Sequence, residues 1–109
     1  MRDAYHEQLD RVSDDLVEMT RLVGSAMNRA TQALLDADLQ LAESVIAGDD
    51  AIDAIASKVE ADCFQVSALQ QPVATDLRVI VAALRISASL ERMGDLAAHI
   101  AKSARLRYP

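Results

Sequence analysis

Apolar residues recur along this chain in alternating steps of three and four, the spacing of one face of an α-helix that packs against other helices. Three such runs of nearly equal length follow one another. The first contains Tyr5, Leu9, Val12, Leu16, Met19, Val23, Ala26, Ala30 and Leu34. The second contains Leu39, Ile46, Ile52, Ile55, Val59, Val66 and Leu69, with Asp62 as a polar break. The third contains Val79, Ala83, Ile86, Leu90, Met93, Ala97, Ile100 and Ala104. The pattern therefore predicts three long amphipathic helices.

Helix-breaking signals divide the chain near residues 37 and 71. Asp38 is placed to cap the second helix, and Pro72 is placed in the first turn of the third. Gly48, followed by two aspartates, predicts an interruption of the middle helix with a kink. Short connections make successive helices antiparallel neighbours. We therefore expect an all-α, up-down-up antiparallel three-helix bundle, with residues 1–109 forming a single domain.

The third run carries a second apolar stripe, on the side away from its seam. The stripe consists of Leu77, Val81, Leu84 and Ala88. A single three-helix bundle cannot bury both faces of one helix. Scattered exposed leucines are common, but a continuous apolar ridge more often marks a contact with another domain or subunit. We expect a contact of this kind, and a homodimer through the third helix is its simplest form.

Composition and charge argue against a nucleic-acid-binding, membrane-spanning or secreted protein. The chain has 109 residues, of which 51% are apolar and only 3 are glycine and 2 proline, a balance that favours packed helices. Its net charge of −6 argues against a nucleic-acid surface, which needs lysine and arginine to neutralise phosphates. The apolar run at residues 79–84 is far shorter than the roughly 20 residues of a transmembrane helix. The polar first residues show no signal peptide, and the lone Cys63 fits a reducing compartment, so a cytoplasmic protein is expected.

Candidate chemistry lies in the stretch LERMGDLAAHI, residues 90–100. Glu91, Asp95 and His99 follow one another at four-residue intervals and therefore lie along one ridge of the third helix. Two carboxylates at this spacing can share one cation or bridge two. The same spacing also occurs on ordinary solvated helices, and a lone histidine on such a ridge is more often a surface residue than a ligand.

A second acidic pair, Asp49 and Asp53, repeats the spacing on the middle helix. This pair lies about 20 residues before the turn of the hairpin, and Glu91 and Asp95 lie about 21 residues after it, so both pairs fall at the same height. Four carboxylates at one level of a bundle predict a site for Mg²⁺, Mn²⁺, Fe or Zn²⁺. The alternative for Asp49 and Asp53 is a capping role at a helix that begins after Gly48.

Residues 70–102, QQPVATDLRVIVAALRISASLERMGDLAAHIAK, resemble the signature of the PhoU family of bacterial phosphate-transport accessory and signalling proteins. The resemblance rests on the pattern QP-x-A-x-DLR at residues 71–78, on LERMGD at residues 90–95, and on Ile100 and Ala101. It extends upstream through residues 29–53 and covers essentially the whole chain. It implies a fold of paired three-helix repeats, of which this chain matches one, of the N-terminal type.

The resemblance also has implications for the metal. Some members bind multinuclear metal clusters through pairs of acidic four-residue motifs. Glu91 and Asp95 match the motif of the third helix, and Asp49 and Asp53 match its companion on the second. His99 stands where the family usually has asparagine, so this chain departs from the family pattern at one turn beyond the motif.

The resemblance implies a non-enzymatic cytoplasmic regulator. Such a protein couples the ATPase of a phosphate ABC transporter to a sensor histidine kinase and helps to repress phosphate-starvation genes. Two alternatives remain open from the residues. One is a carboxylate-bridged metal centre with hydrolytic or oxidative activity, and the other is a structural module whose acids face solvent and whose role is oligomerisation.

Overall fold

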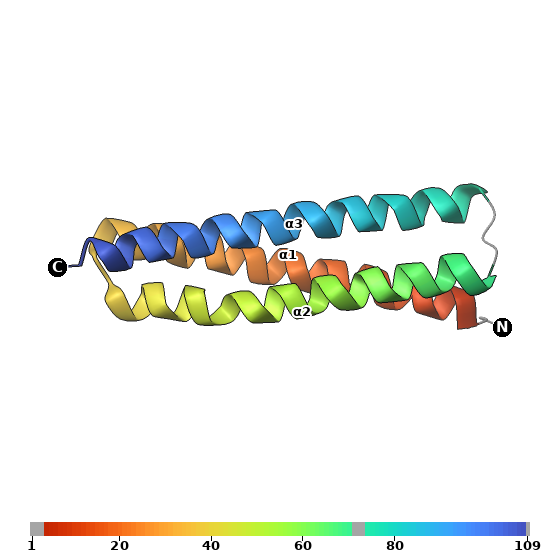
Figure 1. The fold of residues 1–109 in the computed structure, drawn as a ribbon, viewed down its shortest axis with the longest axis horizontal. Helices are drawn as coiled ribbons and strands as arrows, with labels where there is room; N and C mark the ends of the chain where they lie inside the picture. The colour runs from red at the N-terminus through yellow and green to blue at the C-terminus, as the bar shows by residue number, and fades with distance from the viewer. Residues whose placement is uncertain (1–3, 71–73, 109) are drawn as a thin grey trace.

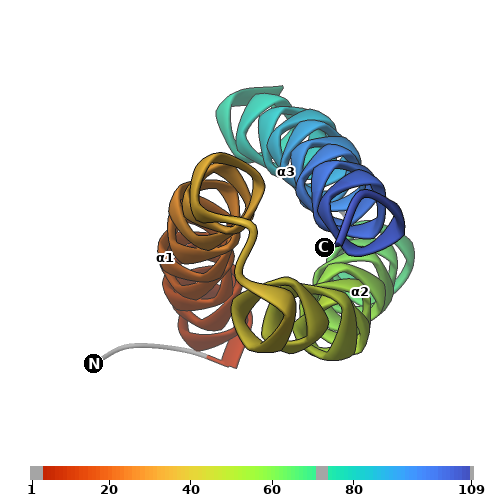
Figure 2. The ribbon, with the colours of Figure 1, turned by 90° about the vertical axis from the view of Figure 1, so that its left-hand side faces the viewer.

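The computed structural model describes residues 4–70 and 74–108, which form three long helices. Helix α1 spans Ala4–Asp36, α2 spans Leu39–Gln70 and α3 spans Ala74–Leu106. The helices run up, down and up beside one another in a rod of 57 × 21 × 17 Å (Figure 1). Viewed along the rod, the three helices lie around a common axis (Figure 2). Their buried apolar residues form one cluster. The all-α, three-helix bundle predicted from the sequence is confirmed.

The junction between α1 and α2 is a tight turn. Ala37 adopts a left-handed conformation with φ 52°, and the Asp38 amide donates to the Ala33 carbonyl at 3.0 Å, closing the end of α1. The Asp38 carboxylate then accepts a hydrogen bond from the Leu41 amide at 3.0 Å, which confirms the predicted N-cap of α2. The predicted role of Pro72 at the other junction lies outside the described residues.

Ala37→Gly is expected to raise the free energy of unfolding by about 0.5–1 kcal/mol. The left-handed conformation strains a side chain with a Cβ, and relief of that strain exceeds the entropic penalty of glycine. Urea denaturation followed by circular dichroism measures the change. The matched control is Ala61→Gly, an exposed position inside α2, where glycine is expected to destabilise by about 1 kcal/mol. Equal destabilisation by both substitutions contradicts the explanation.

The expected interruption at Gly48 is wrong. Helix α2 continues without a break from Leu39 to Gln70. Glycine inside a helix costs only about 1 kcal/mol, and Val45 and Ile52, which are 2% exposed on either side of Gly48, pack into the bundle core only if the helix continues. The capping interpretation of Asp49 and Asp53 falls with the break, because both residues lie in the helix interior.

The core follows the predicted seam on α1 and α2 more closely than on α3. Val12, Met19, Val23, Val59 and Val66 are all buried, as is Cys63, although Leu34 at the end of α1 is exposed. On α3 the buried positions at seven-residue intervals are Ile80, Ser87, Gly94 and Ala101. Of the predicted seam, Ala83, Leu90, Ala97 and Ala104 are also buried, whereas Val79, Ile86 and Met93 are 43–50% exposed.

The reason for this difference is the size of the side chains. Besides Ile80, the buried line on α3 consists of the small residues Ser87, Gly94 and Ala101. At Gly94 the lack of a side chain allows α3 to approach Ile52 and Asp49 of α2 closely. Apolar residues consequently remain on the outer side of α3. These include the stripe of Leu77, Val81 and Leu84, which are 46%, 40% and 36% exposed. The exposure of this second stripe agrees with the prediction that the bundle cannot bury it.

Candidate metal centre

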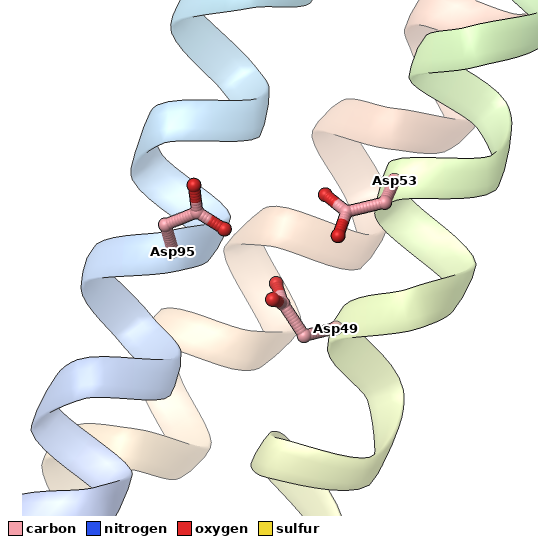
Figure 3. A group of neighbouring side chains, drawn as sticks. All are labelled: Asp49, Asp53 and Asp95. Atoms are coloured by element: carbon pink, nitrogen blue, oxygen red, sulfur yellow. The ribbon is translucent and has the colours of Figure 1, made fainter.

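Three aspartates from two helices meet in the space between α2 and α3. Asp49 and Asp53 project from successive turns of α2, and Asp95 projects towards them from α3 (Figure 3). One carboxylate oxygen from each of the three lies within 4.8 Å of the other two. Asp49 and Asp53 are partly buried, whereas Asp95 is exposed. The antiparallel register therefore brings acids about 42–46 positions apart in the chain to one level of the bundle.

The other two residues named from the sequence lie differently. Glu91 makes a hydrogen-bonding contact with Asp53 and so belongs to the same acidic group, one turn along α3 from Asp95. We call Asp49, Asp53, Glu91 and Asp95 the carboxylate cluster. His99 is exposed, and it is not part of the three-residue group that brings ligand atoms together in the described part of the chain.

Gly94 allows the two helices to approach at this level, a role that the sequence pattern did not reveal. A Cβ atom at Gly94 would lie 3.2 Å from Ile52 Cδ1 and 3.5 Å from Asp49 Oδ1. The first distance is shorter than an ordinary van der Waals contact, so a side chain larger than a methyl group has no room. The signal available in the sequence was a glycine between Met93 and Asp95 inside an otherwise uninterrupted helix, a placement that often has a packing reason.

The carboxylates disfavour one another's charge. Burial raises the pKa of Asp49 above its ordinary value, and the negative charges of Asp53 and Asp95 raise it further. Asp49 Oδ1 is buried and has no hydrogen-bond partner. Among the residues described, no lysine or arginine forms an ion pair with any member of the cluster. The cluster is thus a partly buried, uncompensated negative site.

Glu91 shows the same effect from the other side of the cluster. Its pKa is raised first by the hydrogen-bonding contact with Asp53, then by burial, and then by the charges of Asp53, Asp95 and Glu60. A hydrogen bond between two carboxyl groups requires that one of them be protonated. Without a cation, the cluster therefore tends to retain protons.

The metal-free protein is expected to become less stable as pH rises through the raised pKa values. A carboxyl group whose pKa is higher in the folded than in the unfolded state contributes its full stability below the unfolded value, about 4, and loses it as pH rises. Asp49→Asn/Glu91→Gln removes two of these charges. In EDTA at pH 7 this variant should exceed wild type in unfolding free energy by about 0.5–1 kcal/mol, and at pH 4 the difference should vanish.

Chemical denaturation at several pH values measures that difference. The control is Glu43→Gln, at an exposed position elsewhere on α2, for which the difference from wild type should not follow pH in this way. A variant that is less stable than wild type at pH 7 in EDTA contradicts the electrostatic account of the cluster.

The residues fit a hard or borderline cation. The donor atoms are carboxylate oxygens, the ligands preferred by Mg²⁺ and Mn²⁺ and accepted by iron and zinc. The buried Asp49 oxygen lacks any partner in the protein, and such atoms ordinarily have one. A cation between the three aspartates would supply that partner and would offset the repulsion that raises the pKa of Asp49 and Glu91.

Comparison with known proteins decides the family. A family model described as the PhoU domain matches residues 16–104. The chain belongs to the PhoU family. Its 109 residues are 54% identical to the "Phosphate-specific transport system accessory protein PhoU homolog 1" of Mycobacterium leprae, and they cover 49% of that protein. The resemblance inferred from residues 70–102 is confirmed.

Solved PhoU structures share the fold. The crystal structure of PhoU from Pseudomonas aeruginosa superposes on 94% of this chain with a TM-score of 0.91 and 35% identity. That of the phosphate transport system regulatory protein PhoU from Streptococcus pneumoniae superposes on 92% with a TM-score of 0.84 and 32% identity. The chain covers 49% and 47% of these two proteins. It is thus a single PhoU-type repeat that spans about half the length of the relatives it matches.

The helices are not suited to crossing a bilayer. Within residues 4–70 and 74–108, no helix contains a stretch that is both long and apolar enough for a membrane span.

Proposed function

We propose that this PhoU repeat regulates phosphate uptake and phosphate-starvation signalling, and that the carboxylate cluster binds a divalent metal ion in doing so. The observation that carries the metal site is the convergence of Asp49, Asp53 and Asp95 within 4.8 Å from two helices, together with the unpartnered buried oxygen of Asp49. The phosphate role is supported by the names of the relatives, which are accessory proteins of phosphate-specific transport.

In this proposal Asp49 and Asp53 hold the ion from α2, and Asp95 holds it from α3. Glu91 lies beside Asp53 and orients its carboxyl group or adds a further ligand. A bound ion would supply positive charge that offsets the repulsion within the cluster, with ligands from both α2 and α3. Gly94 keeps the two helices close enough for both to contribute. The bound ion therefore changes the charge of one face of the bundle without requiring a change of fold.

A regulator must present surfaces whose affinity differs between the states of its partners, because coupling requires differential binding. We propose that the partners are the ATPase of a phosphate ABC transporter and a sensor histidine kinase, and that the outcome is repression of starvation genes. Metal binding at the cluster would place a divalent cation on this face, where it can contact an acidic group of a partner that the metal-free face repels. Loss of the aspartate charges without the ion does not supply that contact.

The test is a binding measurement between the purified chain and these two partners from the same organism. In Mn²⁺ the chain should bind the transporter ATPase subunit and the cytoplasmic part of the kinase, and Asp49→Asn/Asp95→Asn should bind at least about 10-fold more weakly. The control is Asp50→Asn, next to the cluster but exposed, which should bind as wild type does. The absence of binding to both partners contradicts the regulatory proposal, whereas equal binding by wild type and double variant contradicts the role of the metal.

A further inference from the structure

A groove between α2 and α3 adjoins the carboxylate cluster. It has a volume of about 440 Å³, and its lining includes Glu60, Phe64 and Ser67 from α2 and Leu84, Ala88 and Glu91 from α3. Phe64, the only phenylalanine in the chain, is 75% exposed. A large aromatic side chain held in solvent beside an apolar groove is an anchor typical of binding surfaces.

The groove continues along α3 as a helical seam. Leu77, Val81, Leu84 and Ala88 follow one another in steps of four and three, which is the spacing of the a and d positions of a coiled coil. All four are exposed. An α-helix laid against this seam and against Phe64 of α2 buries a continuous apolar ridge, and this matches the mode in which proteins bind amphipathic helices in grooves.

Three arginines flank the seam on its solvent side. Arg78, Arg85 and Arg92 lie seven residues apart. Arg78 follows Leu77 and Arg85 follows Leu84 of the seam, whereas Arg92 follows Glu91, beyond the end of the seam. All three are exposed, and none forms a hydrogen bond or ion pair within the described part of the chain. They form a basic line on a chain whose net charge is −6. Charged residues in this flanking position select the charge of the partner helix.

We propose that the groove between α2 and α3 binds an amphipathic helix of another protein that carries acidic residues along the flank facing Arg78, Arg85 and Arg92. The opposite flank of that helix faces Glu60 of α2, so it is neutral or basic there. The apolar ridge of the partner contacts Phe64, Leu84 and Val81. This inference goes beyond the proposed phosphate role and does not depend on it.

A second copy of this chain fits the same face less well. In a two-fold symmetric contact the same patch meets itself, so an α3–α3 pair brings the line of arginines on one chain close to the same line on the other. Like charges in opposition weaken such a pairing. The homodimer through α3 expected from the sequence stays a prediction, and the charge pattern favours an acidic partner over it.

The experiment uses the whole chain and two synthetic helical peptides of about three heptads, labelled with fluorescein. Both have leucine at the seam positions and glutamine on one flank, and the other flank is glutamate in one peptide and lysine in the other. At low salt the glutamate peptide should bind about 10-fold more tightly than the lysine peptide. Arg78→Glu/Arg85→Glu should abolish this preference, and Arg11→Glu, at an exposed arginine of α1, should retain it.

Further measurements test whether the variants fold and whether something other than an acidic helix binds in the groove. Phe64→Asp changes a largely solvent-exposed position and should weaken binding of both peptides while the circular dichroism spectrum stays that of wild type. Failure of both peptides to bind, equal binding of the two, or preference for lysine overturns the proposal. A dimer seen by light scattering that blocks the glutamate peptide makes a second copy the occupant. Sedimentation with phosphatidylglycerol vesicles, without binding of the peptide, makes the face a membrane contact.

Discussion

Asp49→Asn/Asp95→Asn should abolish the thermal stabilisation that Mn²⁺ gives to the wild-type chain. A ligand at 100 times its dissociation constant stabilises the folded state by about 2.7 kcal/mol. For a domain of this size that corresponds to an increase in Tm of about 10 °C or more. Asparagine keeps the shape of aspartate but removes one negative charge from each of two helices, so the double variant loses most of the attraction for the cation.

The same variant should be at least as stable as wild type when the metal is removed. Repulsion among Asp49, Asp53 and Asp95 raises the pKa of Asp49, and the double substitution relieves that repulsion. Thermal denaturation in EDTA and in Mn²⁺ gives both values for each protein. The control Asp50→Asn should keep the full response to Mn²⁺. Loss of stability in EDTA together with an unchanged response to Mn²⁺ means that these aspartates are structural.

Gly94→Leu should destabilise the fold by about 1–3 kcal/mol, the usual effect of overpacking a close contact. Even a Cβ atom at this position meets Ile52 and Asp49 at 3.2 Å and 3.5 Å, and a larger side chain forces α2 and α3 apart. The separation moves Asp95 away from Asp49 and Asp53, so the response of Tm to Mn²⁺ should fall with it. Gly94→Leu is therefore expected to weaken Mn²⁺ binding although it changes no carboxylate.

Two matched variants separate this effect from helix propensity. Gly24 has no atom within 4 Å of an added Cβ, so Gly24→Leu should stabilise the helix by about 1 kcal/mol and leave the Mn²⁺ response unchanged. At Gly94, the methyl group of alanine meets Ile52 Cδ1 at 3.2 Å, Ile52 Cγ2 at 3.4 Å and Asp49 Oδ1 at 3.5 Å. A small movement of Ile52 relieves these contacts and the helix gains propensity, so Gly94→Ala should stay within about 0.5 kcal/mol of wild type. Equal effects of leucine at both glycines contradict the importance of the close approach.

The helix boundaries were predictable because local chemistry determines them. Asp38 is a good N-cap wherever it stands in a helical pattern, and the structure shows its carboxylate in that role. The break predicted at Gly48 is absent because the effect of this glycine depends on the packing of Val45 and Ile52, which the sequence does not show. A local penalty of about 1 kcal/mol is easily exceeded by the burial of two such side chains.

The face that α3 buries was predicted less well, also for a physical reason. Apolar residues cover more than half of the circumference of this helix, so periodicity alone does not decide which of them enter the core. Ser87 and Gly94 enter it because they are small and let the helices approach, whereas Ile86 and Met93 remain outside. The hydrophobic pattern indicates which residues favour burial. The volume of each side chain then decides which of them fit between closely packed helices.

The carboxylate cluster was predictable because residues that lie equally far before and after the turn of an antiparallel hairpin lie at the same level of the bundle. Counting from the hairpin brought Asp49, Asp53, Glu91 and Asp95 to one level, and the structure places all four in contact or near contact there. The four-residue spacing does not decide which side chains converge, and His99 shows this, since it follows the same spacing but is not part of the group formed by Asp49, Asp53 and Asp95. The role of Gly94 needed distances between atoms of two helices.

The central claim is that the three aspartates hold a cation between α2 and α3. The most direct measurement is anomalous diffraction from a crystal of the chain grown with Mn²⁺. The account predicts an anomalous peak in contact with carboxylate oxygens of Asp49, Asp53 and Asp95, and its disappearance in Asp49→Asn/Asp95→Asn. A well-ordered site without such a peak, or with the Asp95 carboxylate turned away from Asp49 in the presence of Mn²⁺, contradicts it.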